Sequence, residues 1–118
     1  TLESRSLMAF TANDFTESAL NRLPDLNADG YDDLAVAYND VNRNQTRLSI
    51  LNGRNQDVLK EMRISNVWRT LEVWPLSASQ GVPRIAWLMQ NRNSDHVQLQ
   101  VRNSNTGQTL LTRRMLDD

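Results

Sequence analysis

One segment near the amino end, DLNADGYDD, alternates oxygen-bearing side chains in a way that is typical of a calcium loop. It places Asp25, Asn27, Asp29 and Asp33 at loop positions 1, 3, 5 and 9. A hard cation such as Ca²⁺ takes roughly six to eight oxygen ligands from a backbone that winds tightly around it. We therefore predict one calcium site, to which Tyr31 at position 7 contributes its backbone carbonyl.

The residues between these ligands fit the same interpretation. Gly30 at position 6 permits the sharp turn that brings the second half of the loop back to the ion. Leu26 and Ala28 are expected to point away from the ion, toward packing. An EF-hand begins in the same way, but it needs a bidentate Glu at position 12, where this chain has Val36. The apolar run that ends at Tyr38 is also too short for the second EF-hand helix.

The alternative to a metal site is an ordinary turn, because Asn, Asp and Gly favour turns without any ion. Four oxygen side chains in alternation, together with a glycine at the sixth position, favour the metal. The acid that closes the loop is Asp33, at the expected start of a strand.

Other reactive side chains do not form a catalytic set. The chain has no cysteine, which excludes thiolate catalysis, disulfides and cysteine-bound zinc. The one histidine, His96, lies at an expected strand start, where a surface or turn role is more usual. Asp32-Asp33 and Asp117-Asp118 have no plausible partner group for acid–base catalysis, so we expect a protein that is not an enzyme.

Composition excludes further classes of partner. The chain has 118 residues and a formal net charge of −1. It therefore lacks the Lys and Arg excess on which nucleic-acid binding depends. No run of apolar residues is long enough for a membrane span. Three tryptophans, Trp68, Trp74 and Trp87, could form a carbohydrate-stacking face, but we expect them to pack in the core.

The sequence repeats itself. Pro24 falls on Pro75 at an offset of 51 residues. The same offset aligns further pairs in order, namely Leu20 with Leu71, Gly30 with Gly81, Leu34 with Ile85, Ala35 with Ala86, Leu48 with Leu99, Ile50 with Val101 and Asn52 with Asn103. A one-residue slip is then expected, which aligns Val58-Leu59 with Leu110-Leu111 and Ile64 with Leu116. We interpret residues 16–66 and 67–118 as two diverged copies of one unit.

Each unit is expected to contain four short strands. The segments 34–38, 47–51, 85–89 and 97–101 are apolar or alternate apolar with polar residues, and Gly, Asn and Asp clusters separate them. In the last of these segments Val97, Leu99 and Val101 should share one face, opposite two glutamines. The strand centres are predicted near Leu20, Val36, Leu48, Leu59, Val73, Trp87, Leu99 and Leu110.

The stretch LPDLNADGYDDLAV, residues 23–36, resembles the calcium loop and following strand of FG-GAP and VCBS-type repeats, the family that builds integrin α-subunit propellers and many bacterial surface proteins. This resemblance implies a β-propeller blade with Ca²⁺ bound between its first two strands, by Asp25, Asn27, Asp29, Tyr31 and Asp33. The second unit departs from the pattern and keeps only Gly81. Its residues at the ligand positions are Leu76, Ala78, Gln80, Val82 and Arg84, so we expect one calcium site and a degenerate second loop.

The sequence thus predicts an all-β chain of two four-stranded antiparallel blades packed face to face. Residues 1–15 are expected to carry, at Ser6–Thr11, the last strand of a preceding blade. Propellers typically use about four to eight blades, so two blades cannot close a ring. We expect a larger repeat array or self-association, and the remaining alternative is that the two sheets simply form a sandwich.

The expected function is that of a calcium-binding, non-catalytic repeat module for protein or glycan binding and adhesion. The location is expected to be extracellular or at the cell surface, because weak calcium sites work where calcium is abundant. The alternative is a structural accessory domain of a larger secreted enzyme or toxin.

Overall fold

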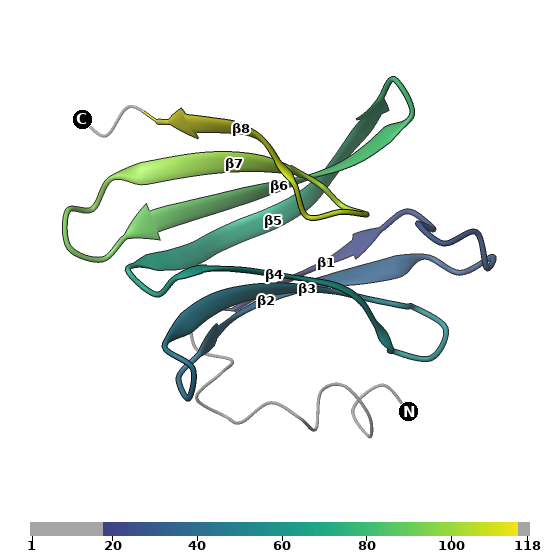
Figure 1. Cartoon of the computed structure of the whole chain (residues 1–118), viewed down its shortest axis with the longest axis horizontal. Helices are drawn as coiled ribbons and strands as arrows, with labels where there is room; N and C mark the ends of the chain where they lie inside the picture. Colours follow the sequence, from purple (N-terminus) through teal and green to yellow (C-terminus); the bar gives the residue numbers. More distant parts are fainter. Residues whose placement is uncertain (1–17, 116–118) are drawn as a thin grey trace.

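The computed structural model describes residues 18–115, which form two antiparallel β-sheets (Figure 1). Sheet 1 contains, in spatial order, β1 (Ala19–Leu23), β2 (Asp33–Asp40), β3 (Gln45–Leu51) and β4 (Val58–Ser65). Sheet 2 contains, in spatial order, β5 (Trp68–Ser79), β6 (Val82–Asn91), β7 (Val97–Asn103) and β8 (Thr109–Arg114). Sequential strands are therefore neighbours throughout each sheet.

The all-β prediction and its two four-stranded antiparallel sheets are confirmed, and the sheets do not close into a barrel. The part of the chain that the structure describes contains no helix, and so none long and apolar enough to cross a membrane. The segment Ser6–Thr11, predicted to be a strand of a preceding blade, lies outside the described residues.

The hairpin turns are built by side chains of Asn and Asp. In four of them the first residue accepts a hydrogen bond through its side-chain oxygen from a backbone N–H inside the turn. Such side chains imitate a turn of the backbone and so favour chain reversal. The residues that begin these turns are Asp40, Asn52, Asn91 and Asn103, and each turn places one residue at positive φ, namely Asn44 (57°), Gln56 (64°), Asp95 (62°) and Gly107 (80°).

Pairing of the first two strands does not repeat at an offset of 51, because Leu20 pairs with Val36 but Trp87 pairs with Val73. Pairing of the second with the third strand does repeat at this offset. Leu34 of β2 pairs with Leu51 of β3, and the residues 51 later, Ile85 and Arg102, also pair. The pairing of the third with the fourth strand repeats as well, including a bulge between Ile50 and Leu51 in sheet 1 and between Val101 and Arg102 in sheet 2.

The expected one-residue slip between the two units is wrong. Leu51 pairs with Val58, and Arg102 pairs with Thr109, so Val58 corresponds to Thr109 at the unchanged offset of 51 (109 − 58 = 51). Sequence similarity at Val58-Leu59 and Leu110-Leu111 was misleading, because strand pairing rather than residue type fixes the register.

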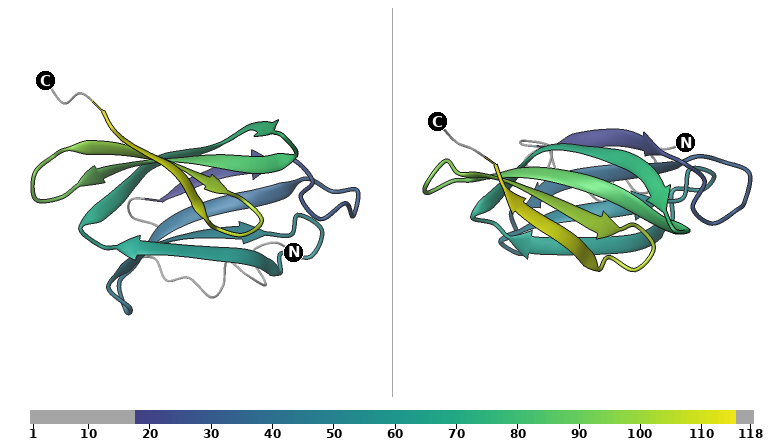
Figure 2. Two further views of the ribbon diagram at one scale, coloured as in Figure 1. Left: turned by 45° about the horizontal axis from the view of Figure 1, so that its top comes forward. Right: turned by 90° about the horizontal axis from the view of Figure 1, so that it is seen from above.

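The two sheets lie one over the other (Figure 2). The core cluster contains side chains from both sheets and lies between them. Trp87 of β6 is fully buried there, its indole Nε1 donates to Thr70 Oγ1 at 2.8 Å, and the Arg102 guanidinium lies 5.4 Å from its ring centre. Trp68 packs against this cluster, but Trp74 does not belong to it. The expectation that the tryptophans are core residues is therefore confirmed for Trp87 and Trp68, and it is wrong for Trp74. The buried members of the cluster are Leu23, Ala35, Ala37, Leu48, Ile50, Met62, Val73, Ile85, Trp87 and Met89.

The two sheets meet through different faces. Ala35 and Ala37 of β2 belong to the same hydrophobic core cluster as Ile85, Trp87 and Met89 of β6. The β6 residues 51 after Ala35 and Ala37 have even numbers, so by strand alternation they lie on the other face of sheet 2. Sheet 1 thus packs on sheet 2 through the face that carries Ala35 and Ala37. Sheet 2 packs on sheet 1 through the opposite face, which carries Ile85, Trp87 and Met89.

Candidate metal centre

The connection between β1 and β2 brings three carboxylates together. Asp25, Asp29 and Asp33 each offer an oxygen atom, and these atoms all lie within 4.8 Å of one another. Asp33 is fully buried as the first residue of β2, whereas Asp25 and Asp29 are half-buried. It is the only such grouping of acidic, His or Cys side chains between residues 18 and 115. These are three of the five predicted ligands.

Asp33 closes the loop. Its Oδ2 accepts a hydrogen bond from the Leu26 amide at 2.7 Å, and its Oδ1 accepts one from the Gly53 amide at 3.1 Å. Both donors are backbone groups, so the carboxylate is held in one orientation. The buried charge of Asp33 is thereby partly satisfied, and the start of the loop is fastened to its end.

Asp25 accepts hydrogen bonds from backbone amides in the middle of the loop. Its oxygens accept hydrogen bonds from Asp29 N at 3.2 Å and Gly30 N at 2.7 Å. Desolvation raises the pKa of Asp25, but hydrogen bonds from Gly30, Asp29, Ala28 and Asn27 together outweigh it, so the pKa lies below its ordinary value of 3.8. The carboxylate form that a cation requires is therefore favoured.

Asp29 has an oxygen without a partner. Its Oδ1 accepts a hydrogen bond from Tyr31 N at 3.0 Å, but its Oδ2 is buried and has no hydrogen-bond partner. Leaving a buried acceptor unsatisfied costs about 1–3 kcal/mol, and more when the group is charged. A cation between the three carboxylates would satisfy this oxygen.

The Asn27 amide faces the same carboxylates. With its oxygen turned toward Asp25 Oδ1 and Asp29 Oδ1, the Asn27 side chain could join them as a ligand of a shared cation. Turned over, its NH₂ donates to Asp25 Oδ1 at 3.0 Å and to Asp29 Oδ1 at 3.2 Å, and its oxygen accepts from Asn52 Nδ2 at 2.9 Å. The first orientation suits a metal-bound loop and the second suits a metal-free one.

The side chain of Tyr31 lies on the outside of the loop. It is 52 % exposed, and the Arg54 guanidinium lies 5.8 Å from its ring centre. Tyr31 was predicted to contribute only its backbone carbonyl, which leaves the ring free for this contact. The ring and the guanidinium link the loop to the turn between β3 and β4.

Two loop residues adopt left-handed backbone conformations. Gly30 has φ 90°, as its role in the sharp turn requires, and Ala28 has φ 61°. Ala28 is exposed, so the expectation that it points toward packing is wrong, whereas Leu26 does pack against the core cluster. A positive φ costs an alanine roughly 1–2 kcal/mol, and nothing in the local sequence signals it.

Sequence reasoning missed the contribution of Asn52 and Gly53, whose residue types by themselves indicate only a turn. A Cβ atom on Gly53 would overlap the carbonyl oxygen of Asp32, so the loop leaves space for glycine alone. Asn52 is buried and lies next to Asn27. An Asn-Gly turn is so common between strands that its presence in a sequence does not indicate a nearby metal site.

The second sheet lacks an equivalent loop. β5 and β6 run on as a hairpin that reverses at Gln80 (φ 53°) and Gly81 (φ 79°), the positive φ values of a type I′ turn. Arg84, 51 residues after Asp33, pairs with Leu76, and its guanidinium donates to the Ser77 carbonyl at 2.7 and 3.0 Å. The predicted ligand equivalents therefore lie in strands or in this turn, and they form no cluster of oxygens.

Comparison with known proteins adds no further assignment to this geometry. No protein-family model matches the sequence, no curated protein matches it, and no solved structure matches the fold.

Proposed function

We propose that the chain is a calcium-binding, non-catalytic repeat module whose loop between β1 and β2 holds one Ca²⁺. The ligands are the side chains of Asp25, Asn27, Asp29 and Asp33 and the carbonyl of Tyr31. The observation that carries the proposal is Asp29 Oδ2, a buried carboxylate oxygen with no partner beside two further carboxylates. The resemblance of this loop to those of FG-GAP and VCBS repeats also supports the proposal.

The donor set favours calcium over other metals. All the side-chain donors are carboxylate or amide oxygens, which suit hard cations, whereas zinc and copper sites use His or Cys. Mg²⁺ demands a near-octahedral shell and keeps several waters, whereas Ca²⁺ tolerates an irregular shell built by a winding loop.

The cation would act on stability and on loop shape rather than on a reaction. It would neutralise three carboxylates that repel one another within 4.8 Å. Because Asp33 also binds the Gly53 amide, ordering of the loop would extend to the turn between β3 and β4. Such a module suits a calcium-rich setting outside the cell, where a rigid repeat presents loops and edges to a protein or glycan partner.

Calorimetric titration of the calcium-free chain with CaCl₂ tests this function. The proposal predicts saturable binding of one Ca²⁺, abolished by Asp29→Asn. The matched control is Asp32→Asn, which removes the same charge from the same loop at an exposed residue outside the carboxylate cluster. Absence of binding to the unmodified chain, or equal loss in both variants, would refute the proposal.

We also propose that each sheet is a blade of a longer stack. The support is the way in which the sheets meet: Ala35 and Ala37 lie on the face of sheet 1 that packs on sheet 2. The residues 51 later, Ala86 and Leu88, are still apolar although they lie on the outer face of sheet 2. The same holds for Leu48 and Ile50, whose equivalents are Leu99 and Val101.

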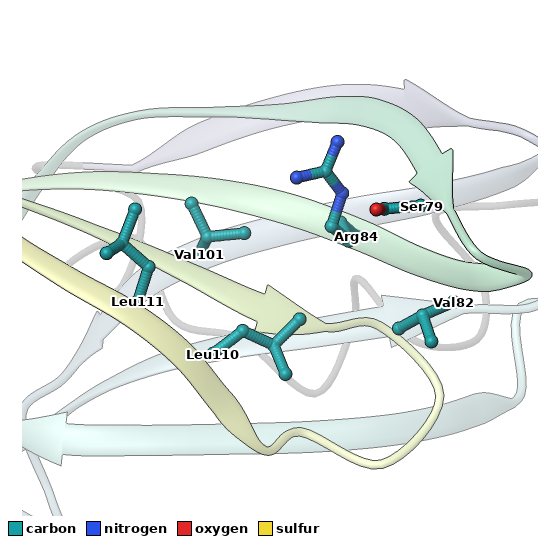
Figure 3. Close-up of a pocket in the computed structure, with 6 residues that line it drawn as sticks. All are labelled: Ser79, Val82, Arg84, Val101, Leu110 and Leu111. Atoms are coloured by element: carbon teal, nitrogen blue, oxygen red, sulfur yellow. The ribbon is translucent and has the colours of Figure 1, made fainter.

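The outer face of sheet 2 is also hollowed. A depression of about 300 Å³ is lined by residues of β5 to β8 (Figure 3), namely Ser79, Val82, Arg84, Val101, Leu110 and Leu111. Leu110 and Leu111 are 43 % and 42 % exposed. The occupant proposed for this face is a third sheet of the same type, packed as sheet 2 packs on sheet 1.

A further inference from the structure

The calcium loop contacts a second amide outside its own sequence, that of Asn52 in the turn after β3. In the metal-free orientation described above, the Asn27 oxygen accepts a hydrogen bond from Asn52 Nδ2 at 2.9 Å. Asn52 is only 8 % exposed, whereas Asn27 is exposed, so loss of this bond would leave the Asn52 NH₂ with little access to water. The inference that follows rests on the proposed calcium site.

The orientation of Asn52 is fixed from its other side. Its Oδ1 accepts a hydrogen bond from the Arg54 amide at 2.8 Å, and its backbone carbonyl accepts one from Gln56 N at 2.7 Å. The side chain therefore turns its NH₂ toward Asn27. Rotation of the Asn52 amide would place that NH₂ against the Arg54 N–H, so one donor would face another.

Calcium requires the opposite orientation of Asn27, because a metal ligand must present its oxygen. The Asn27 NH₂ would then lie about as close to Asn52 Nδ2 as the Asn27 oxygen does in the metal-free orientation. Both groups are NH₂ donors, so neither can accept a hydrogen bond from the other. Metal binding must therefore break the bond between Asn27 and Asn52 and leave the buried Asn52 NH₂ facing another donor.

We propose that Asn52 is a positioning residue that lowers the calcium affinity of the loop by holding Asn27 in its metal-free orientation. Its side chain stabilises the metal-free loop, in which the Asn27 NH₂ takes the place of the cation between Asp25 and Asp29. Asn52 thereby sets the calcium concentration at which the loop changes state, and it couples that change to the turn between β3 and β4.

The substitution Asn52→Asp tests this role because it exchanges the donor for an acceptor without changing the size of the side chain. One oxygen of the new carboxylate keeps the bond from Arg54 N, and the other accepts from the Asn27 NH₂ only when the Asn27 oxygen faces the metal. Mutation of a residue that hydrogen-bonds to a metal ligand typically changes metal affinity about 10–100-fold. We expect Asn52→Asp to tighten calcium binding about tenfold in a calorimetric titration.

The negative charge that Asn52→Asp adds would by itself strengthen calcium binding. Asn55→Asp adds the same charge in the same turn and controls for this effect. Asn55 lies in the same turn, is exposed, and uses its Oδ1 to accept from Asp57 N at 3.0 Å, a bond that aspartate preserves. It has no hydrogen bond to Asn27 in the structure. We expect Asn55→Asp to tighten binding about twofold at most.

The calcium-free melting temperature gives a second readout with the opposite sign. Asn52→Asp should lower it, because the carboxylate cannot donate to the Asn27 oxygen, whereas Asn55→Asp should leave it nearly unchanged. If Asn52→Asp binds calcium no more tightly than Asn55→Asp, the role of Asn52 is refuted and the calcium site stands. If the unmodified chain binds no calcium, the proposed site itself fails.

Discussion

The carboxylate of Asp33 accepts a hydrogen bond from the backbone amide of Gly53 at 3.1 Å, which joins the end of the carboxylate loop to the turn after β3. The same turn touches the loop at two further places, through Asn52 beside Asn27 and through Arg54 beside the ring of Tyr31. The loop is therefore packed against a second hairpin turn of its own sheet, and its shape depends on residues well outside the DLNADGYDD pattern.

Replacing Gly53 with alanine should destabilise the protein and disturb the loop. The new Cβ would overlap the Asp32 carbonyl oxygen, and backbone cannot move aside as cheaply as a flexible side chain. Overpacking costs about 1–3 kcal/mol, and we expect the upper end or more, measured by urea unfolding without calcium. Gly81→Ala is the control, since a Cβ there meets nothing within 4 Å and only the positive φ is strained. Equal losses in the two variants would contradict the close packing at Gly53.

Two isosteric changes in the carboxylate cluster should act in opposite directions when calcium is removed. Asp33→Asn places an NH₂ against the amide of Leu26 or Gly53, so we expect a loss of about 1–3 kcal/mol. Asp29→Asn removes a charge whose Oδ2 has no partner, so the melting temperature in chelator should rise. Differential scanning calorimetry of both variants checks this. A fall for Asp29→Asn would mean that its carboxylate is already satisfied without a cation.

Acid should weaken the calcium-free loop through Asp25. The folded-state pKa of this group lies below 3.8, so its contribution to stability is complete above that pH and is lost as the pH falls through the folded pKa. Thermal melts of the unmodified chain and of Asp25→Asn, from neutral pH downward, should converge in acid. A direct check is the carboxyl titration of Asp25 by NMR, where a midpoint above 3.8 would overturn the prediction.

The stack proposed for the sheets can be tested by lengthening the chain. A second copy of residues 67–118, joined after residue 118, would present the Trp87 face to the outer face of sheet 2. We expect one cooperative transition at a higher melting temperature, as for repeat proteins stabilised by neighbour interfaces. Leu99→Glu in the original copy should abolish the gain. Two separate transitions, or an unchanged melting temperature, would show that the face does not accept a sheet.

The sequence could predict the strands because alternation survives in short segments such as 97–101, where Val101 is buried and the glutamines lie on the other face. It could predict Asp25, Asp29 and Asp33 because carboxylates at alternate positions of a tight loop converge on one point. Residue type alone could not place Gly53 or Asn52, since their role depends on which turn packs on the loop. It also could not show that the second unit would replace the loop with a hairpin reversing at Gln80 and Gly81.

The central claim is that the loop between β1 and β2 binds calcium in the folded state, and thermal unfolding with calcium or with excess chelator tests it most directly. A ligand at about 100 times its dissociation constant stabilises the native state by about 2.7 kcal/mol. For a chain of 118 residues each kcal/mol raises the melting temperature by roughly 3–6 °C, between the ranges for smaller and larger domains. We predict a rise of at least several degrees with calcium, absent in Asp29→Asn and retained in Asp32→Asn. Coincident curves for the unmodified chain in calcium and in chelator would contradict the account.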